Sequence, residues 1–169
     1  VMDDLANLDC KALGMTQERF DALASQCRTL RAWFYLRLLD EFRNVPLAVS
    51  SDVTKNSESN VSPEELFSFI ESELLESVEL LPKKAGAAGN ALDQGQWTKA
   101  AAAALLVRLY LNAEVYIGIP MYDECAGIAR KIIDGEYGSC SIEPTWDKVF
   151  DWDNENSPEV IFGFPSAKG

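Results

Sequence analysis

Apolar residues recur at three- and four-residue spacing in four separate stretches of this chain. This spacing places apolar side chains on one face of an α-helix, whereas a half-buried strand requires strict alternation. The pattern predicts helices over residues 17–42, 63–81, 98–117 and 121–134. Consecutive helices with these connections favour an all-α fold built from antiparallel helix pairs.

Hydroxyl residues mark the starts of these helices, because their oxygen can accept a hydrogen bond from the first helical turn. Ser62 precedes Pro63 and Glu65 in a Ser-x-x-Glu capping box. Thr16 and Thr98 stand directly before the first and third predicted helices. These signals predict the helix boundaries to within a few residues.

The first predicted helix carries apolar residues on nearly every side. Its main stripe consists of Phe20, Leu23, Cys27, Leu30, Phe34 and Leu38. Trp33, Tyr35, Leu36 and Leu39 widen this stripe. We therefore expect the helix to be buried on more than one side.

The turn between the third and fourth predicted helices has small Ala113 and Cys125 outside aromatic Tyr116 and Tyr122. This order is similar to a tetratricopeptide repeat, in which small residues allow close approach of two helices. An ordinary helix hairpin is the alternative interpretation. The residues expected at one helix–helix contact are Leu109, Ala113, Tyr116, Tyr122, Cys125 and Ala129.

Residues 140–169 differ from the helical part and are predicted to form a loop and a strand segment. Residues 145–150 indicate a short aromatic turn or a helical stub. The apolar run 159–164 is bounded by prolines and is a strand candidate.

Charge and residue content exclude several function classes. The 169 residues carry a net charge of −12 and no histidine. The negative charge opposes nucleic-acid binding. The lack of histidine removes Ser-His-Asp and Cys-His catalysis and histidine-ligated metal sites. These observations weaken the interpretation of the chain as an enzyme, and we predict no catalytic activity, catalytic residue, metal or cofactor.

Two further features give weak signals. Asp151, Asp153 and Glu155 alternate, but their surroundings fit a calcium loop poorly, and a solvated acidic turn is the simpler interpretation. The cysteines form no Cys-x-x-Cys pair, so zinc and thioredoxin-like sites lack support. A disulfide among them stays open; they are Cys10, Cys27, Cys125 and Cys140.

Four phrases resemble, in order, parts of the SusD/RagB family and together cover roughly residues 28–164. They are LRAWFYLRLLDEFRNVPL (30–47), ELFSFIESELLESVELLP (65–82), TKAAAAALLVRLYLNAEVYIGIPMYDECAGIARKII (98–133) and DNENSPEVIF (153–162). The resemblance implies a tetratricopeptide-repeat-like SusD scaffold. It also predicts that residues 1–169 form a single domain and a fragment of a larger SusD-like protein.

The same resemblance implies a glycan-binding component of an outer-membrane nutrient uptake system. Such a protein is a surface-exposed lipoprotein of the cell outer membrane that captures oligosaccharides or polysaccharides for a TonB-dependent, SusC-like transporter. Aromatic stacking and hydrogen bonds would hold the sugar, with no bond broken. A tetratricopeptide-type helical adaptor that binds a protein or peptide is the alternative.

The resemblance places most ligand loops outside these residues, so no glycan-binding residue is carried over from the family. Within the chain, Trp146 and Trp152 are the candidate ligand-binding residues because they lie in loop-like sequence. Packing in the core or in a turn is the alternative for both. Trp33 and Trp97 are expected to pack within helices or at their ends.

Overall fold

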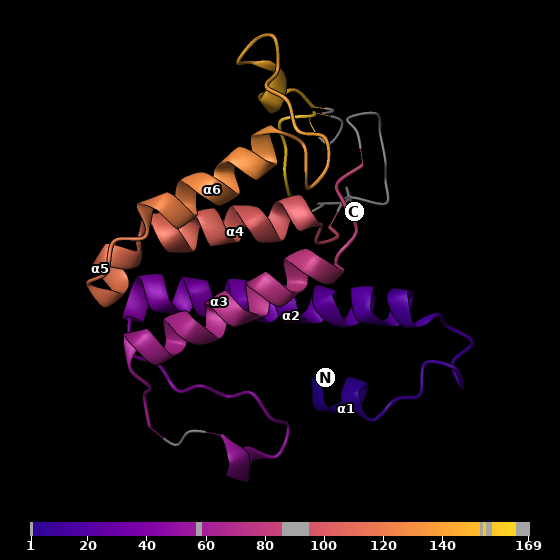
Figure 1. Cartoon of the computed structure of the whole chain (residues 1–169), viewed down its shortest axis with the longest axis vertical. Helices are drawn as coiled ribbons and strands as arrows, with labels where there is room; N and C mark the ends of the chain where they lie inside the picture. The colour runs from indigo at the N-terminus through magenta and orange to yellow at the C-terminus, as the bar shows by residue number, and fades with distance from the viewer. Residues whose placement is uncertain (1, 57–58, 86–94, 153, 155–156, 165–169) are drawn as a thin grey trace.

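The computed structural model describes residues 2–56, 59–85, 95–152, 154 and 157–164, and these residues form helices joined by loops (Figure 1). The α-helices are α1 (Met2–Ala6), α2 (Gln17–Phe42), α3 (Pro63–Leu80), α4 (Lys99–Leu111), α5 (Ala113–Ile117) and α6 (Tyr122–Ile133). Two 3-10 helices, η1 (Val53–Lys55) and η2 (Lys148–Phe150), lie in loops. The second of these confirms the short stub expected within residues 145–150.

The long helices stack in the order in which they occur in the chain. Helix α2 packs against α3, α3 against α4, and α4 against α6. Each of these helices runs antiparallel to the one before it (Figure 1). The all-α prediction with antiparallel helix pairs is therefore confirmed.

The predicted capping residues form their hydrogen bonds. Ser62 Oγ accepts from the Glu65 N–H at 3.1 Å, and Thr98 Oγ1 accepts from the Ala101 N–H at 3.3 Å. Thr16 caps α2 in the same way. Because each cap satisfies a backbone donor that has no partner within the helix, it sets where the helix begins.

The helix predicted over 98–117 is interrupted, which corrects that boundary. Asn112 ends α4 and precedes α5, with φ −103° and ψ 7°. Its Nδ2 donates to the carbonyl of Arg108 at 2.8 Å. An asparagine that bonds the nearby backbone competes with the helical ladder, and this accounts for the break.

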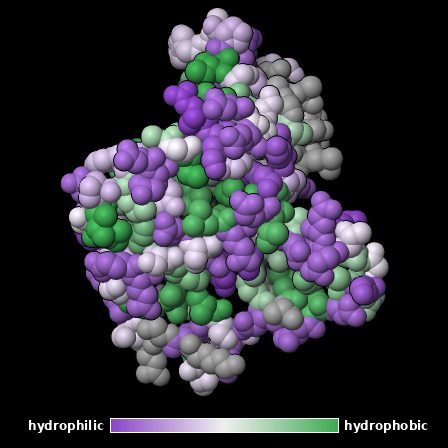
Figure 2. All heavy atoms as spheres, viewed as in Figure 1, coloured by the Kyte–Doolittle hydropathy of each residue, from purple (hydrophilic) through white to green (hydrophobic). Residues whose placement is uncertain are grey.

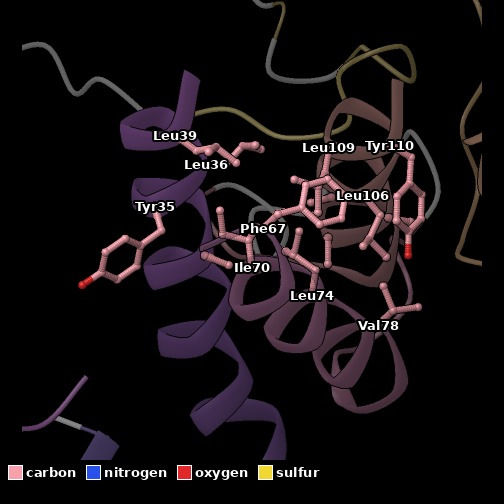
Figure 3. Close-up of a cluster of buried hydrophobic side chains, with 14 of the residues drawn as sticks. Tyr35, Leu36, Leu39, Phe67, Ile70, Leu74, Val78, Leu106, Leu109 and Tyr110 are labelled. Atoms are coloured by element: carbon pink, nitrogen blue, oxygen red, sulfur yellow. The ribbon is translucent and has the colours of Figure 1, made fainter. Parts of the chain in front are cut away.

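The core lies where α3 passes between α2 and α4, and Figure 3 shows side chains from all three helices meeting there. The aliphatic side chains in it are almost completely removed from solvent. They include Leu36 and Leu39 of α2, Ile70, Leu74 and Val78 of α3, and Leu106 and Leu109 of α4. Burying one such side chain contributes about 1.5–3 kcal/mol relative to exposure.

The stripe expected to face the core from α2 is not the face that the structure buries. Leu23, Leu30 and Phe34 are 48%, 37% and 54% exposed. The buried face instead contains small polar residues, and Thr29 Oγ1 donates to the carbonyl of Ser25 at 2.7 Å. The prediction was wrong for these three residues because a hydroxyl that bonds its own helix can be buried, and because α2 is apolar nearly all round. Three of the residues expected to widen the stripe are buried: Tyr35, Leu36 and Leu39.

The strand expected over 159–164 is absent from the described residues, which is a second correction. Phe162 stacks on Trp97 with ring centroids 3.9 Å apart and planes 6° apart, and Phe164 meets Trp33 edge-on at 5.4 Å. An isolated strand has no partner for its backbone groups, so aromatic contacts hold this segment instead. Packing of Trp33 and Trp97 at the helices is confirmed.

The tetratricopeptide-like contact forms only in part. Ala113 and Cys125 are buried, as expected. Tyr122 is 52% exposed, and the buried Tyr116 points its hydroxyl to Asp40 of α2, with an O–O distance of 2.8 Å. Burial and the Asp40 carboxylate raise the pKa of Tyr116 to about 12. Tyr116 thus ties α5 to α2 through a protonated phenol.

Gly138, which follows α6, makes a close backbone contact with Lys84, which follows α3. The Lys84 N–H donates to the carbonyl of Tyr137 at 3.0 Å, and the Ser139 N–H donates to the carbonyl of Lys84 at 3.3 Å. Gly138 has φ +120°, and a Cβ there would lie 2.2 Å from the carbonyl oxygen of Lys84. Both the dihedral angle and the contact therefore require glycine.

Replacing the fully buried Ala113 with phenylalanine should lower the free energy of unfolding by about 1–3 kcal/mol, because the larger side chain overpacks the interior. Chemical denaturation followed by circular dichroism measures this change. Ala126→Phe on the exposed side of α6 is the matched control and should change stability by less than about 0.5 kcal/mol. Equal loss in both variants would contradict the buried position of Ala113.

Gly138→Ala should destabilise the protein by more than about 1 kcal/mol, because the new Cβ meets backbone that cannot rotate away. Gly127→Ala is the control. Gly127 lies within α6 with open space around it, so this change should stabilise by about 0.4–1 kcal/mol. Thermal melts of the two variants should move in opposite directions, and a Gly138→Ala melt at or above that of the parent would show that the contact is absent.

Candidate functional site

Residues 141–152, 154 and 157–160 form a loop whose two ends are joined. The Ser141 N–H donates to the carbonyl of Pro158 at 3.4 Å, and the Glu143 N–H donates to Glu159 Oε2 at 3.0 Å. In Figure 1 the yellow-orange segment that follows α6 projects beyond the C-terminal end of that helix, away from α2 and α3. We call these described residues the projecting loop.

Short-range hydrogen bonds give the projecting loop its internal structure. The Phe150 N–H donates to the carbonyl of Asp147 at 2.9 Å within η2, and Asn154 Nδ2 donates to the carbonyl of Val149 at 3.1 Å. Lys148 Nζ lies 2.7 Å from Asp151 Oδ2. Local turns of this kind order a loop that buries few of its own side chains.

The two predicted site residues both lie on the projecting loop with their indoles in solvent. Trp146 is 81% exposed and Trp152 is 93% exposed. Packing in the core therefore applies to neither, whereas packing within a turn, the other alternative, fits the contact of Trp146 with Phe150. Two further apolar residues of the loop, Ile142 and Phe150, are 85% and 75% exposed and were not among the predicted residues. Like Trp146 and Trp152, they are apolar residues in a segment without helical or alternating spacing, and this sequence pattern could have identified them.

Two of the exposed aromatic groups lie together on the projecting loop. Trp146 and Phe150 meet edge-on with centroids 6.0 Å apart. In the space-filling view, apolar residues of this loop lie among hydrophilic ones (Figure 2). Exposed apolar groups rimmed by polar residues are typical of binding surfaces. Such a surface can stack against an apolar face of a ligand while the ligand's polar groups stay in water.

The carboxylates of the projecting loop are held by hydrogen bonds and ion pairs. A hydrogen bond from the Thr145 hydroxyl holds the pKa of Asp147 below its usual range. The acidic turn considered for a cation includes Asp153 and Glu155, which lie outside the described residues. Among the residues that are described, no three His, Cys, Asp or Glu side chains gather in a way that would hold a metal.

A hollow lies where the start of α2 meets the end of α3 and the start of α4. It has a volume of about 630 Å³, and its lining includes Thr16, Arg19, Asp21, Glu79 and Lys99. Lys99 Nζ donates to the carbonyl of Glu79 at 2.7 Å. None of the lining residues that the structure describes is aromatic, so these residues offer no stacking surface.

The remaining features do not add a chemical centre. The thiols of Cys10, Cys27, Cys125 and Cys140 are free, so the disulfide left open by the sequence does not form. Burial raises the pKa of the Cys140 thiol, which makes it a weak nucleophile. Within the part of the chain that the structure describes, no helix has both the length and the apolar character needed to cross a bilayer.

Comparison with known proteins gives one relative by sequence and several by structure. The starch-binding protein SusD of Bacteroides thetaiotaomicron is 30% identical over 151 residues, which cover 88% of this chain and 25% of SusD. NanU of Bacteroides fragilis has a TM-score of 0.80 at 19% identity, over 99% of this chain and 32% of that one. Surface glycan-binding protein A of Bacteroides uniformis has a TM-score of 0.72 at 20% identity, over 88% and 31%.

No family model matches the chain. The chain spans about a quarter of the length of SusD and about a third of the two solved structures. At this identity the solved structures show the fold, and the alignment with SusD covers most of the residues in which the four resembling phrases lie. The fold and the sequence thus agree with the resemblance to the SusD/RagB family: the chain is similar to SusD over 88% of its own residues and shares the fold of the two solved structures.

Proposed function

We propose that this chain is part of a glycan-binding protein that captures oligosaccharides. The observation that carries this proposal is the projecting loop, which presents Trp146 and Trp152 at 81% and 93% exposure on a SusD-like scaffold. We assign the ligand contacts within this chain to these two indoles. The names of the relatives, a starch-binding protein and a surface glycan-binding protein, support the same ligand class.

The chemistry of an indole suits this ligand. A pyranose ring has an apolar C–H face that can lie against a flat aromatic ring, which releases water from both. The loop's closure at Ser141 and Pro158 limits how far the two indoles can move apart. Restricting this motion before the ligand arrives lowers the entropy cost of binding.

Binding without turnover follows from the residues available on the loop. Glycoside hydrolysis needs one carboxyl group as acid and a second as base or nucleophile, both facing the scissile bond. Here Asp151 is paired with Lys148 at 2.7 Å, and Glu159 accepts the Glu143 N–H at 3.0 Å. These carboxylates are engaged in holding the loop, so we propose no catalytic role for them.

We further propose that the whole protein acts at the cell outer membrane as a surface-exposed lipoprotein. Its partner would be a TonB-dependent, SusC-like transporter that imports the captured glycan. The similarity to SusD motivates both parts of this proposal. In this arrangement the helical layers α2, α3, α4 and α6 serve as a rigid support for the projecting loop.

One observation favours the alternative of a helical adaptor for a protein or peptide. The outer stripe of α2 leaves Leu23, Leu30 and Phe34 between 37% and 54% exposed. An exposed apolar stripe on a long helix is a usual contact for another helix or peptide. The two functions therefore predict binding at different places on the molecule.

Titration of the chain with a panel of oligosaccharides, followed by calorimetry and tryptophan fluorescence, tests the proposed site. We expect weak binding, with Kd near 1 mM, or about −4 kcal/mol, because a surface loop supplies fewer contacts than a pocket. Trp146→Ala and Trp152→Ala should each weaken binding about tenfold. Phe34→Ala removes an exposed aromatic ring from α2 and should leave glycan affinity unchanged.

Other results would change the assignment. Glycan binding that survives both tryptophan variants would move the site away from the projecting loop. Peptide binding that is lost in Phe34→Ala, without any glycan binding, would support the adaptor. Release of shortened sugars that stops when a single aspartate or glutamate is replaced would contradict the proposal of a protein without catalytic activity.

A further inference from the structure

We infer that the projecting loop selects uncharged oligosaccharides and disfavours anionic glycans, such as those that carry uronate or sulfate groups. This inference rests on the proposed function and adds a ligand class to it. It starts from the charges around the two indoles. Residues 141–164 contain a single basic residue, Lys148, and these acidic ones: Glu143, Asp147, Asp151, Asp153, Glu155 and Glu159.

The one basic residue of the loop is already engaged. Lys148 Nζ lies 2.7 Å from Asp151 Oδ2, and the two side chains are 56% and 39% exposed. A ligand carboxylate or sulfate that approached Lys148 would have to compete with Asp151. Proteins that recognise anionic groups usually present an arginine fork or backbone N–H groups to them, and this loop contains no arginine.

A carboxylate adjoins each of the two indoles in the sequence. Asp147 directly follows Trp146 and precedes η2, and the Thr145 hydroxyl stabilises its ionised form. Asp151 directly precedes Trp152 and carries an ion pair. Each candidate stacking residue is therefore adjacent to a carboxylate, and the charge of the one beside Trp152 is partly offset by its ion pair with Lys148.

Elementary electrostatics gives the size of the effect. Like charges about 8 Å apart at the surface repel by about 0.5 kcal/mol in water, and physiological salt screens part of this. The loop carries several such charges, and the whole chain has a net charge of −12. We expect an anionic derivative to bind about five- to tenfold more weakly than its neutral parent. This difference in affinity should decrease as salt is added.

The test compares matched ligands on the same chain. Maltoheptaose and laminariheptaose are each titrated beside a derivative of the same length with C6 oxidised to a carboxylate, at 0.05 M and 0.5 M NaCl. Asp147→Asn combined with Asp151→Asn should raise affinity for the carboxylated sugars several-fold. The control, Asp123→Asn with Glu124→Gln, makes the same charge change in the first turn of α6, at the opposite end of that helix from the loop (Figure 1).

The outcomes separate the inference from the function on which it rests. The inference is supported if neutral sugars bind more tightly than their carboxylated derivatives. This difference in affinity should shrink in high salt and in the loop variant, but not in the control. Carboxylated sugars that bind as tightly as their neutral parents would overturn it and leave glycan capture standing. If neither member of any pair bound, the proposed function would fail, and the ligand selection would fail with it.

Discussion

Helix α3 must bury two faces at once, because α2 packs on one side of it and α4 on the other. Ile70 and Leu74 are completely buried, and Figure 3 places them between the side chains of the flanking helices. These residues are removed from water only because a helix covers each of the two apolar faces of α3. The order of the stack, and hence the position of α6 and the loop beyond it, depends on this double burial.

A charged contact specifies how α2 lies along α3. Glu73 is 10% exposed at its side chain and accepts from Arg31 Nη2 at 2.6 Å and Nε at 2.8 Å, while Arg28 lies 3.4 Å away. A carboxylate this buried is tolerated only with such partners, and removing them would leave it uncompensated. Any shift of α2 along α3 would break the contact, so apolar burial supplies the attraction and Glu73 the register.

The features that the sequence predicted well are those decided by neighbouring residues. The caps at Ser62 and Thr98 need only the next helical turn, and both form. The buried face of α2 could not be predicted the same way, because apolar periodicity does not say which of several apolar faces meets α3. The segment 159–164 was mistaken for a strand because its partner, Trp97, lies far away in the sequence and contacts Phe162 by its ring.

The same distinction explains the candidate site. The loop position of Trp146 and Trp152 could be predicted because their segment lacks helical or alternating periodicity, whereas their exposure and the closure between Ser141 and Pro158 required the folded chain. That closure depends in turn on the helical layer. Gln26 of α2 exchanges two hydrogen bonds of 2.7 Å with the backbone of Trp97, whose ring stacks on Phe162 just beyond the loop. Leaving two indoles in water has a free-energy cost, which burial of the helical core offsets in the total free energy of folding. The contacts from Gln26 through Trp97 to Phe162 connect that core to the segment just beyond the loop.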